Sequence, residues 1–177
     1  MSMNESTLNA NPLTEAFYSR STIKVARDLL GCHLNRRLAS GVILGAEITE
    51  VEAYTADDPA CHAFKGKTKR TAVLFGPPGR AYVYFIYGMY YCLNVVTEPE
   101  GIPGAILIRG LNGIGLDGPG KICKQWQIDS NFNGLSLLDS DLSLWISKQS
   151  NRKKPVIQTS TRIGISRAQD KLWRFYT

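Results

Sequence analysis

Two glutamates, Glu50 and Glu52, lie two positions apart in a stretch whose residue pattern predicts a β-strand. Side chains alternate between the two faces of a strand, so both carboxylates are expected on the same face. A carboxylate is unfavourable inside a core unless it is paired or functional, whereas an exposed acidic edge is the simpler alternative. Carboxylates, imidazoles and phenols can all take part in proton transfer. Further side chains of these kinds follow along the chain: Tyr54, His62 and Tyr84.

A block of aromatic and β-branched residues runs from Ala81 to Val96 and contains a single glycine, Gly88, near its middle. This pattern predicts a β-hairpin with its tip at Tyr87-Gly88-Met89. Residues at a tight turn have little to pack against within their own domain, so Tyr87, Met89 and Tyr90 are expected to protrude. The hairpin could instead fold back under another element or form a dimer contact. On a basic protein, such side chains could also act as a wedge that unstacks bases.

The chain is basic, since its 177 residues include 21 lysines and arginines against 15 acidic residues, for a net charge of +6. Hydrophobic residues make up 44% and charged residues 20%, which is the composition of a globular domain. Basic residues gather in three groups, at 65–70, 121–124 and 152–154. Such groups suit a polyanionic partner, because each phosphate contact releases condensed counterions. A solvated basic face is the alternative.

The order of apolar periodicities and chain breaks predicts the secondary structure. The expected elements are a helix over Pro12–Leu30 that ends at Gly31, strands over Cys32–Leu38 and Val42–Tyr54, a surface loop over Asp57–Thr71, the hairpin, a strand over Ala105–Arg109, a helix starting at Pro119, and short strands in the tail. Strands dominate the middle and helices the flanks, which favours the α+β class. We expect a single compact domain over residues 12–177, with a curved, mostly antiparallel, roll- or barrel-like sheet, flanking helices and a protruding β-hairpin. Residues 1–11 are expected to form a disordered leader.

Four cysteines lie far apart, without a CxxC pair. Cys32 and Cys61 each precede a histidine, but neither pair has the spacing of zinc ligands, so reduced thiols and no metal are expected. The N-terminal residues lack the apolar segment of a signal peptide, and no apolar run approaches the roughly 20 residues that span a bilayer. These features predict a cytoplasmic protein without membrane association.

Several motifs follow one another in a distinctive order. The first is Thr49-Glu50-Val51-Glu52-Ala53-Tyr54, followed by His62 and by the aromatic block from Tyr82 to Asn94; later segments are 105–109, 118–123, 162–165 and 174–176. In this order they resemble the motifs of the alkyladenine (3-methyladenine) DNA glycosylase family. The resemblance runs from about Leu29 to the end of the chain, and its aromatic block is highly specific. Between Arg109 and Gly118, however, this chain is shorter than family members usually are.

The resemblance implies a role for individual residues. Glu52 would be the general base that activates water for attack at C1′ of deoxyribose, and Arg109 and the backbone carbonyl of Ile163 would hold that water. Four further roles are implied: Tyr54, His62 and Tyr84 line the pocket and stack on an extruded base; Asn94 rejects guanine through its 2-amino group; Tyr87 fills the gap left in the duplex, beside Met89 and Tyr90; and Lys67, Arg70 and Lys121 grip phosphates.

The implied reaction is hydrolysis of the bond between a damaged purine and deoxyribose, which leaves an abasic site. The base must first be extruded, at an unstacking cost of about a few kcal/mol. Alkylation makes the purine cationic, hence a better leaving group and a better partner for aromatic faces. The resemblance implies a monofunctional enzyme without lyase activity, metal or cofactor. Its partner would be double-stranded DNA that contains alkylated or deaminated purines such as hypoxanthine, so the resemblance implies a location at the bacterial nucleoid, or in the nucleus of a eukaryote. A monomer is the simple expectation.

Parts of the sequence are also compatible with two other functions. Residues 113–118 form a GxGxxG pattern typical of dinucleotide binding, but too little chain follows for a parallel sheet, and the preceding strands look antiparallel. A non-catalytic nucleic-acid-binding module would use the hairpin aromatics as a stacking platform. The joint presence of Glu52, Arg109 and Asn94 argues against that module.

Overall fold

The computed structural model describes residues 11–148 and 155–177. Its helices are α2 (Glu15–Tyr18), α3 (Thr22–Leu29) and α4 (Pro119–Gln125), with 3-10 turns η1 (Ala72–Phe75) and η2 (Ser130–Phe132). Its strands are β1 (His33–Arg37), β2 (Ile43–Tyr54), β3 (Ala81–Ile86), β4 (Tyr90–Val96), β5 (Ala105–Leu111), β6 (Leu144–Ser147), β7 (Gln158–Ser160) and β8 (Arg174–Tyr176). The expected leader, except Asn11, and the basic group at 152–154 lie outside the described residues.

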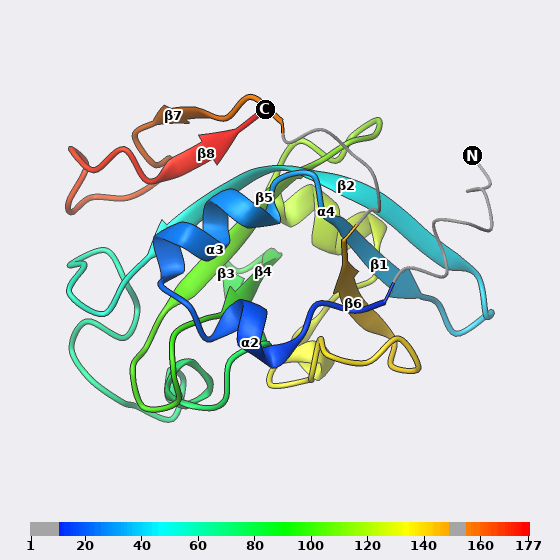
Figure 1. Ribbon diagram of the computed structural model, residues 1–177, viewed down its shortest axis with the longest axis horizontal. Helices are drawn as coiled ribbons and strands as arrows, with labels where there is room; N and C mark the ends of the chain where they lie inside the picture. The colour runs from blue at the N-terminus through cyan, green and yellow to red at the C-terminus, as the bar shows by residue number, and fades with distance from the viewer. Residues whose placement is uncertain (1–10, 149–154) are drawn as a thin grey trace.

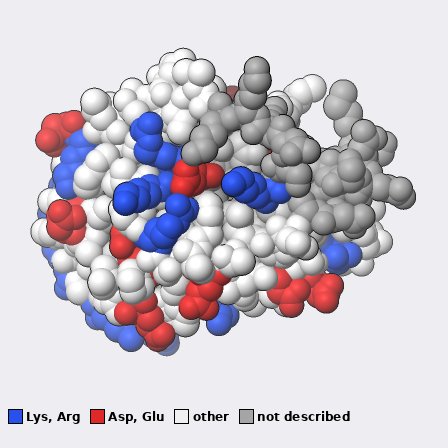
Figure 2. Space-filling view, in the orientation of Figure 1, with Lys and Arg blue, Asp and Glu red and all other residues white. Residues whose placement is uncertain are grey.

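The eight strands found in these two ranges form one antiparallel sheet, in the order β3-β4-β5-β2-β1-β6, with β8 paired to β2 and β7 to β8. The long strand β2 organises this sheet. Its first half pairs with β1 and its second half with β5, while β8 pairs with Glu50–Glu52 along the other edge. Figure 1 shows β2 arching across the molecule above α3 and above the hairpin strands. The same face carries several Lys and Arg side chains towards its middle, with Asp and Glu among them (Figure 2). The α+β class and the curved antiparallel sheet are therefore confirmed.

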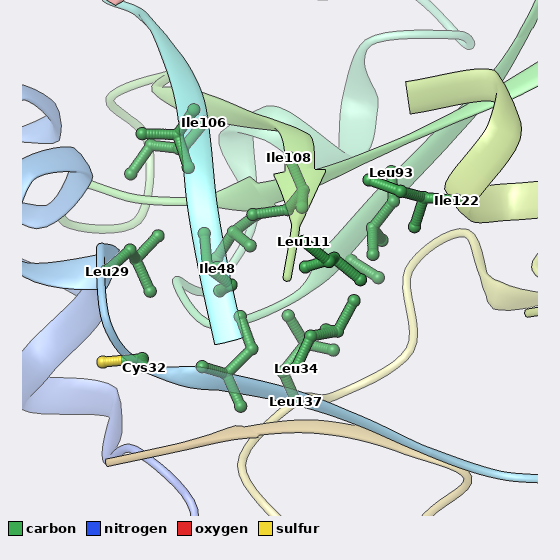
Figure 3. Close-up of a cluster of buried hydrophobic side chains, with 14 of the residues drawn as sticks. Leu29, Cys32, Leu34, Ile48, Leu93, Ile106, Ile108, Leu111, Ile122 and Leu137 are labelled. Atoms are coloured by element: carbon green, nitrogen blue, oxygen red, sulfur yellow. The ribbon is translucent and has the colours of Figure 1, made fainter. Parts of the chain in front are cut away.

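One apolar core joins the sheet to the helices. Leu29 of α3, Ile48 of β2, Leu111 of β5 and Ile122 of α4 are buried and converge in the cluster of Figure 3. Helix α3 packs on β2 and β5, and α4 packs on β4 and β5. Burial of each such side chain contributes about 1.5–3 kcal/mol, so these contacts fix the strands that carry the candidate site. Within the two described ranges, no helix has the length and apolar character needed to cross a membrane.

The single helix expected over 12–30 is wrong, because the chain breaks at Ser19–Ser21 into α2 and α3. A residue far away in the sequence stabilises the start of α3. Oε1 of Glu98 accepts hydrogen bonds from the backbone N–H and the hydroxyl of Thr22, at 2.6 and 2.7 Å. A carboxylate there satisfies a free N–H group and complements the positive end of the helix. Gly31, with a φ of +85°, follows the C-terminus of α3 as predicted.

The hairpin of β3 and β4 is confirmed, with Ile86 paired to Tyr90. The N–H of Met89 donates to the carbonyl of Ile86 at 3.2 Å, and both residues between them, Tyr87 and Gly88, have positive φ, as a type I′ turn requires. The side chains of Tyr87, Met89 and Tyr90 are 76%, 63% and 41% exposed. Their expected protrusion is thus confirmed.

The segment from Asp57 to Thr71 lacks regular secondary structure as expected, but it is not wholly a surface loop. Asp58, Cys61 and Thr71 are buried. Cys61 packs with Leu74 and other apolar residues in a second, smaller cluster. The polar composition of this segment predicts exposure, but Asp58 can be buried because its charge is paired with that of Arg162, far away in the sequence.

Candidate active site

A cavity of about 430 Å³ opens between the hairpin, β5, the first turn of α4 and the segment that follows β7. Its size is within the range of sites that enclose small organic groups. Nine of the predicted site residues line it: Tyr54, His62, Tyr84, Tyr87, Tyr90, Asn94, Arg109, Lys121 and Ile163. Lys67, Arg70, Met89 and Glu52 do not belong to the lining, although Glu52 contacts three residues that do.

Glu52 is completely buried directly behind the cavity wall. Its Oε1 accepts a hydrogen bond from the backbone N–H of Ile163 at 2.7 Å, and its Oε2 accepts one from the hydroxyl of Tyr54 at 2.7 Å. The Nε of Arg109 lies 3.5 Å from Oε1. A buried carboxylate needs such compensation. The amide of Ile163, rather than its carbonyl, is the group that faces Glu52 here.

Arg109 reaches both glutamates because the pairing of β2 with β5 is irregular at this point. The register shifts on either side of the pair Glu50–Gly110 and leaves Arg109 without a partner residue on β2. Such bulges re-aim a side chain next to functional sites. A Cβ at Gly110 would lie only 3.0 Å from Cβ of Glu50, so a glycine permits this close approach of the strands.

Glu50 links Arg109 to a second arginine, Arg174, which does not line the cavity. Its Oε1 accepts hydrogen bonds from Nε of Arg109 at 3.0 Å and from Nε of Arg174 at 2.6 Å. Burial of Glu50 opposes its ionisation, but the hydrogen bonds and charges of Arg174 and Arg109 outweigh burial and hold its pKa below the ordinary 4.5. The same-face prediction for the two glutamates is confirmed, since both contact Arg109. Two arginines and two glutamates therefore form one chain of alternating charge.

The wall formed by the loop and β3 is aromatic. The rings of His62 and Tyr84 meet edge to face with centroids 4.6 Å apart, and Nδ1 of His62 lies 3.0 Å from the hydroxyl of Tyr82. The guanidinium of Arg70 lies over the Tyr84 ring at 5.5 Å. Desolvation, and then the charge of Arg70, hold the pKa of His62 below its ordinary 6.5. This wall therefore offers a neutral imidazole and electron-rich rings.

Two strand residues complete the walls. Asn94 is buried, and its Nδ2 donates to the carbonyl of Tyr82 across the hairpin at 3.1 Å, which fixes the orientation of its amide group. Cys92 also lines the cavity, and burial raises the pKa of its thiol, so it stays neutral. Within the described residues, no group of three or more His, Cys, Asp or Glu side chains is placed to hold a metal ion.

The rim of the cavity is formed by the hairpin tip and the start of α4. A Cβ built on Gly120 would lie 2.9 Å from Cδ1 of Tyr90, so the Tyr90 ring packs directly on the α4 backbone. Lys121, the next residue, forms an exposed ion pair with Asp117 at 3.0 Å. Lys67 and Arg70 lie exposed on the loop before η1. Of these two, Arg70 approaches the cavity through Tyr84.

Three contributors to this site were not predicted from the sequence: the ion pair of Asp58 with Arg162, the bridging role of Glu50, and the contact of Gly120 with Tyr90. Arg162 lies immediately before the predicted Ile163, but no local pattern points to Asp58 as its partner. Gly120 belongs to a matched motif, yet only the fold brings it against the hairpin. Asp58 stands in a polar segment, so nothing in the local sequence indicates that its side chain is buried.

The family model described as methylpurine-DNA glycosylase (MPG) matches residues 16–177. A relative from Wolbachia pipientis wMel is 50% identical over 169 residues, which cover 92% of this chain and 89% of the relative. A relative from Sodalis glossinidius is 47% identical over 169 residues, which cover 92% and 95% of the two chains. Both are named as 3-methyladenine DNA glycosylases. The GxGxxG segment, by contrast, leads from an antiparallel strand into a helix of only seven residues, so the dinucleotide alternative is not supported. The family match and these relatives show that the chain belongs to the methylpurine-DNA glycosylase family of base-excision-repair enzymes.

Proposed function

We propose that this enzyme flips alkylated or deaminated purines out of duplex DNA into the cavity and hydrolyses their N-glycosidic bond. The observation that carries the proposal is the buried carboxylate of Glu52, held by Tyr54, Arg109 and Ile163 at the cavity wall. A carboxylate is kept in such a position for a reason other than stability, since its burial is costly. The enzyme acts as a monofunctional glycosylase and leaves an abasic site, in a bacterial cell at the nucleoid.

In the proposed mechanism, Glu52 is the general base. Each carboxylate oxygen has a second lone pair beyond its protein hydrogen bond, so it can still accept from a water. As the C1′–N bond breaks, the base leaves with the bonding electron pair, and the water oxygen bonds to C1′ while its proton passes to Glu52. The negative charge of Glu52 also stabilises the oxocarbenium-like sugar. Arg109, shared with Glu50, and the carbonyl of Ile163 would hold the water.

The cavity walls are proposed to select the base. Tyr54 on one side and His62 with Tyr84 on the other would stack on it, and a cationic alkylpurine gains from the electron-rich rings. Asn94, with its amide fixed by the Tyr82 carbonyl, would collide with the 2-amino group of guanine. A neutral base such as hypoxanthine is a poorer leaving group, so we expect it to be released more slowly than an alkylated purine.

The hairpin tip and the basic residues are proposed to hold the duplex. Exposed Tyr87 would fill the gap left by the flipped base, with Met89 and Tyr90 beside it. Lys67, Arg70 and Lys121 would contact phosphates, in keeping with the net charge of +6. We propose that the enzyme binds damaged double-stranded DNA as a monomer.

The test is release of free base from alkylated duplex DNA and from a duplex with a single hypoxanthine. Wild type is compared with Glu52→Gln and with Glu15→Gln, which removes the same charge from an exposed position on α2. We expect release by wild type and Glu15→Gln, and loss of release with retained DNA binding in Glu52→Gln. Tight DNA binding without release by wild type would contradict the proposal and favour the non-catalytic binding module.

A further inference from the structure

Arg162 is a fully buried arginine that the proposed mechanism does not use, yet it contacts the walls of the cavity from behind. Its guanidinium forms a two-pronged ion pair with the equally buried Asp58: NH1 donates to Oδ2 and NH2 to Oδ1 at 3.1 Å. NH1 also donates to the carbonyl of Ala53 at 2.9 Å, and NH2 to that of Ala168 at 3.2 Å. The guanidinium lies over the Tyr54 ring at 4.6 Å and near that of Trp173 at 5.3 Å.

These contacts join three parts of the chain that build the cavity. Ala53 lies on β2 between Glu52 and Tyr54, so that hydrogen bond ties Arg162 to the strand of the proposed general base. Asp58 accepts from the N–H of Ala60 through Oδ1, and from that of Cys61 through its carbonyl, so it shapes the turn that leads to His62.

The third part is the segment 161–172, which has no helix or strand of its own. Its second residue is Arg162 and its third is Ile163, whose N–H donates to Glu52. Gly164, with a φ of +75°, follows at once and turns the chain. Ile163 is half exposed, whereas Arg162 beside it is buried and hydrogen-bonded, so Arg162 is the residue that anchors this part of the segment.

The energetics argue for a positional role. A buried ion pair can often be replaced by apolar side chains without loss of stability, because desolvation of the two charges offsets their attraction. The Nε of Arg162 is also buried and finds no hydrogen-bond partner in residues 11–148 or 155–177, which is a further cost. What the planar guanidinium provides, and an apolar side chain does not, is several directed hydrogen bonds and a flat face against an aromatic ring.

We propose that Arg162, oriented by Asp58, is a positioning residue that holds the Tyr54 ring and the Ile163 amide against Glu52. It does not touch the base or the sugar, and it acts only through these two neighbours. The proposal rests on the proposed function for its effect on rate, but its geometric part concerns the folded protein alone.

The test uses two variants and one matched control. In Asp58→Leu/Arg162→Met both charges are replaced by apolar side chains, so the fold is expected to survive. Arg162→Lys keeps the positive charge but lacks the two-pronged donor arrangement of the guanidinium and its planar surface against the Tyr54 ring. The control, Arg36→Met, removes another buried arginine, which donates to the carbonyls of Trp126 and Gln127 and does not line the cavity. The measurements are thermal unfolding, hydrogen exchange of the Ile163 amide, and single-turnover base release from alkylated duplex DNA.

Both Arg162 variants are expected to exchange the Ile163 amide on the order of tenfold faster at unchanged global stability, because its hydrogen bond to a charged acceptor is weakened. Base release should slow about 100-fold, because a displacement of a catalytic group by about 1 Å can reduce the rate by that factor. Arg36→Met should change neither quantity beyond its effect on unfolding. Wild-type exchange and wild-type release in folded Arg162→Lys or in the folded double variant would overturn the proposal. Absence of base release by wild type would contradict the proposed function but not the positioning role, because hydrogen exchange still decides whether Arg162 positions Ile163.

Discussion

The hydroxyl of Tyr54 donates a 2.7 Å hydrogen bond to Oε2 of Glu52, two positions earlier on the same strand. Burial, and then the charge of Glu52, raise the pKa of Tyr54 far above its ordinary value, so the hydroxyl stays protonated and remains a donor. Tyr54 also lines the cavity, whereas Glu52 does not. One side chain thus belongs to the cavity wall and also holds the carboxylate behind that wall.

Tyr54→Phe keeps the ring and removes only this hydrogen bond. Bonds to a charged acceptor are worth about 1.5–3 kcal/mol, so base release should fall about tenfold or more in single-turnover assays. The control is Tyr18→Phe, because the buried Tyr18 hydroxyl has no hydrogen-bond partner in the part of the chain that the structure describes. Tyr18→Phe should leave the rate unchanged. Equal rates for Tyr54→Phe and wild type would show that the hydroxyl does not orient Glu52.

Tyr87→Asn should improve the hairpin and impair the enzyme. Tyr87 has a φ of +54°, a conformation that costs a bulky residue about 1–2 kcal/mol, whereas Asn-Gly is the preferred pair for this turn. We expect the unfolding temperature to stay constant or rise. Affinity for damaged duplex should fall roughly 10- to 100-fold, because the unstacking cost of a few kcal/mol is no longer offset. Undiminished affinity in a binding titration would remove the wedge from the mechanism.

Gly120→Ala tests the contact between α4 and the hairpin. Alanine favours the helix by up to about 1 kcal/mol, but its Cβ would lie 2.9 Å from the Tyr90 ring and force it to move. We therefore expect slower base release without a large loss of stability. The matched change is Gly118→Ser, where a Cβ would meet side-chain carbons of Lys121 at 3.8 and 3.9 Å and no other described atom within 4 Å, and serine is a favourable N-cap. If the two variants release base equally fast, the Tyr90 position is not important.

Glu50 should stabilise the fold at neutral pH but not in acid. Despite its burial, the hydrogen bonds of Arg174 and Arg109 keep its pKa in the folded protein below the ordinary 4.5. The folded state therefore binds the proton less tightly than the unfolded state. The stabilisation is complete above about pH 4.5 and is lost as pH falls through the lower, folded-state pKa. Denaturant unfolding of wild type and Glu50→Gln should differ at pH 7 and converge towards pH 3; a constant difference would contradict the ionic role.

Local patterns in the sequence predicted the parts of this fold that depend on local chemistry. The glycine at the centre of the aromatic block marks the hairpin turn, and the spacing of Glu50 and Glu52 places them on one face of β2. The break between α2 and α3 was not predictable in this way, because the carboxylate that caps Thr22 belongs to Glu98.

The same limit applies to the site. Its lining residues were found through motifs, but the pair of Asp58 with Arg162 joins positions 104 residues apart. The bulge at Arg109 depends on the register between two strands, which no single strand pattern encodes. Contacts of this kind arise only when distant segments fold together, and they decide which charges are buried.

The chain of alternating charge lies on β2, β5 and β8, whereas His62, Tyr84 and Asn94 come from the loop before η1 and from the hairpin strands. The residues that we propose for hydrolysis and those that we propose for base selection therefore lie largely on separate pieces of backbone. We therefore expect substitutions in the loop or hairpin to alter the accepted lesion while Glu52 and Arg109 keep their geometry. If these proposed roles hold, such a division would let members of the family diverge in the lesions they accept without rebuilding the residues that break the bond.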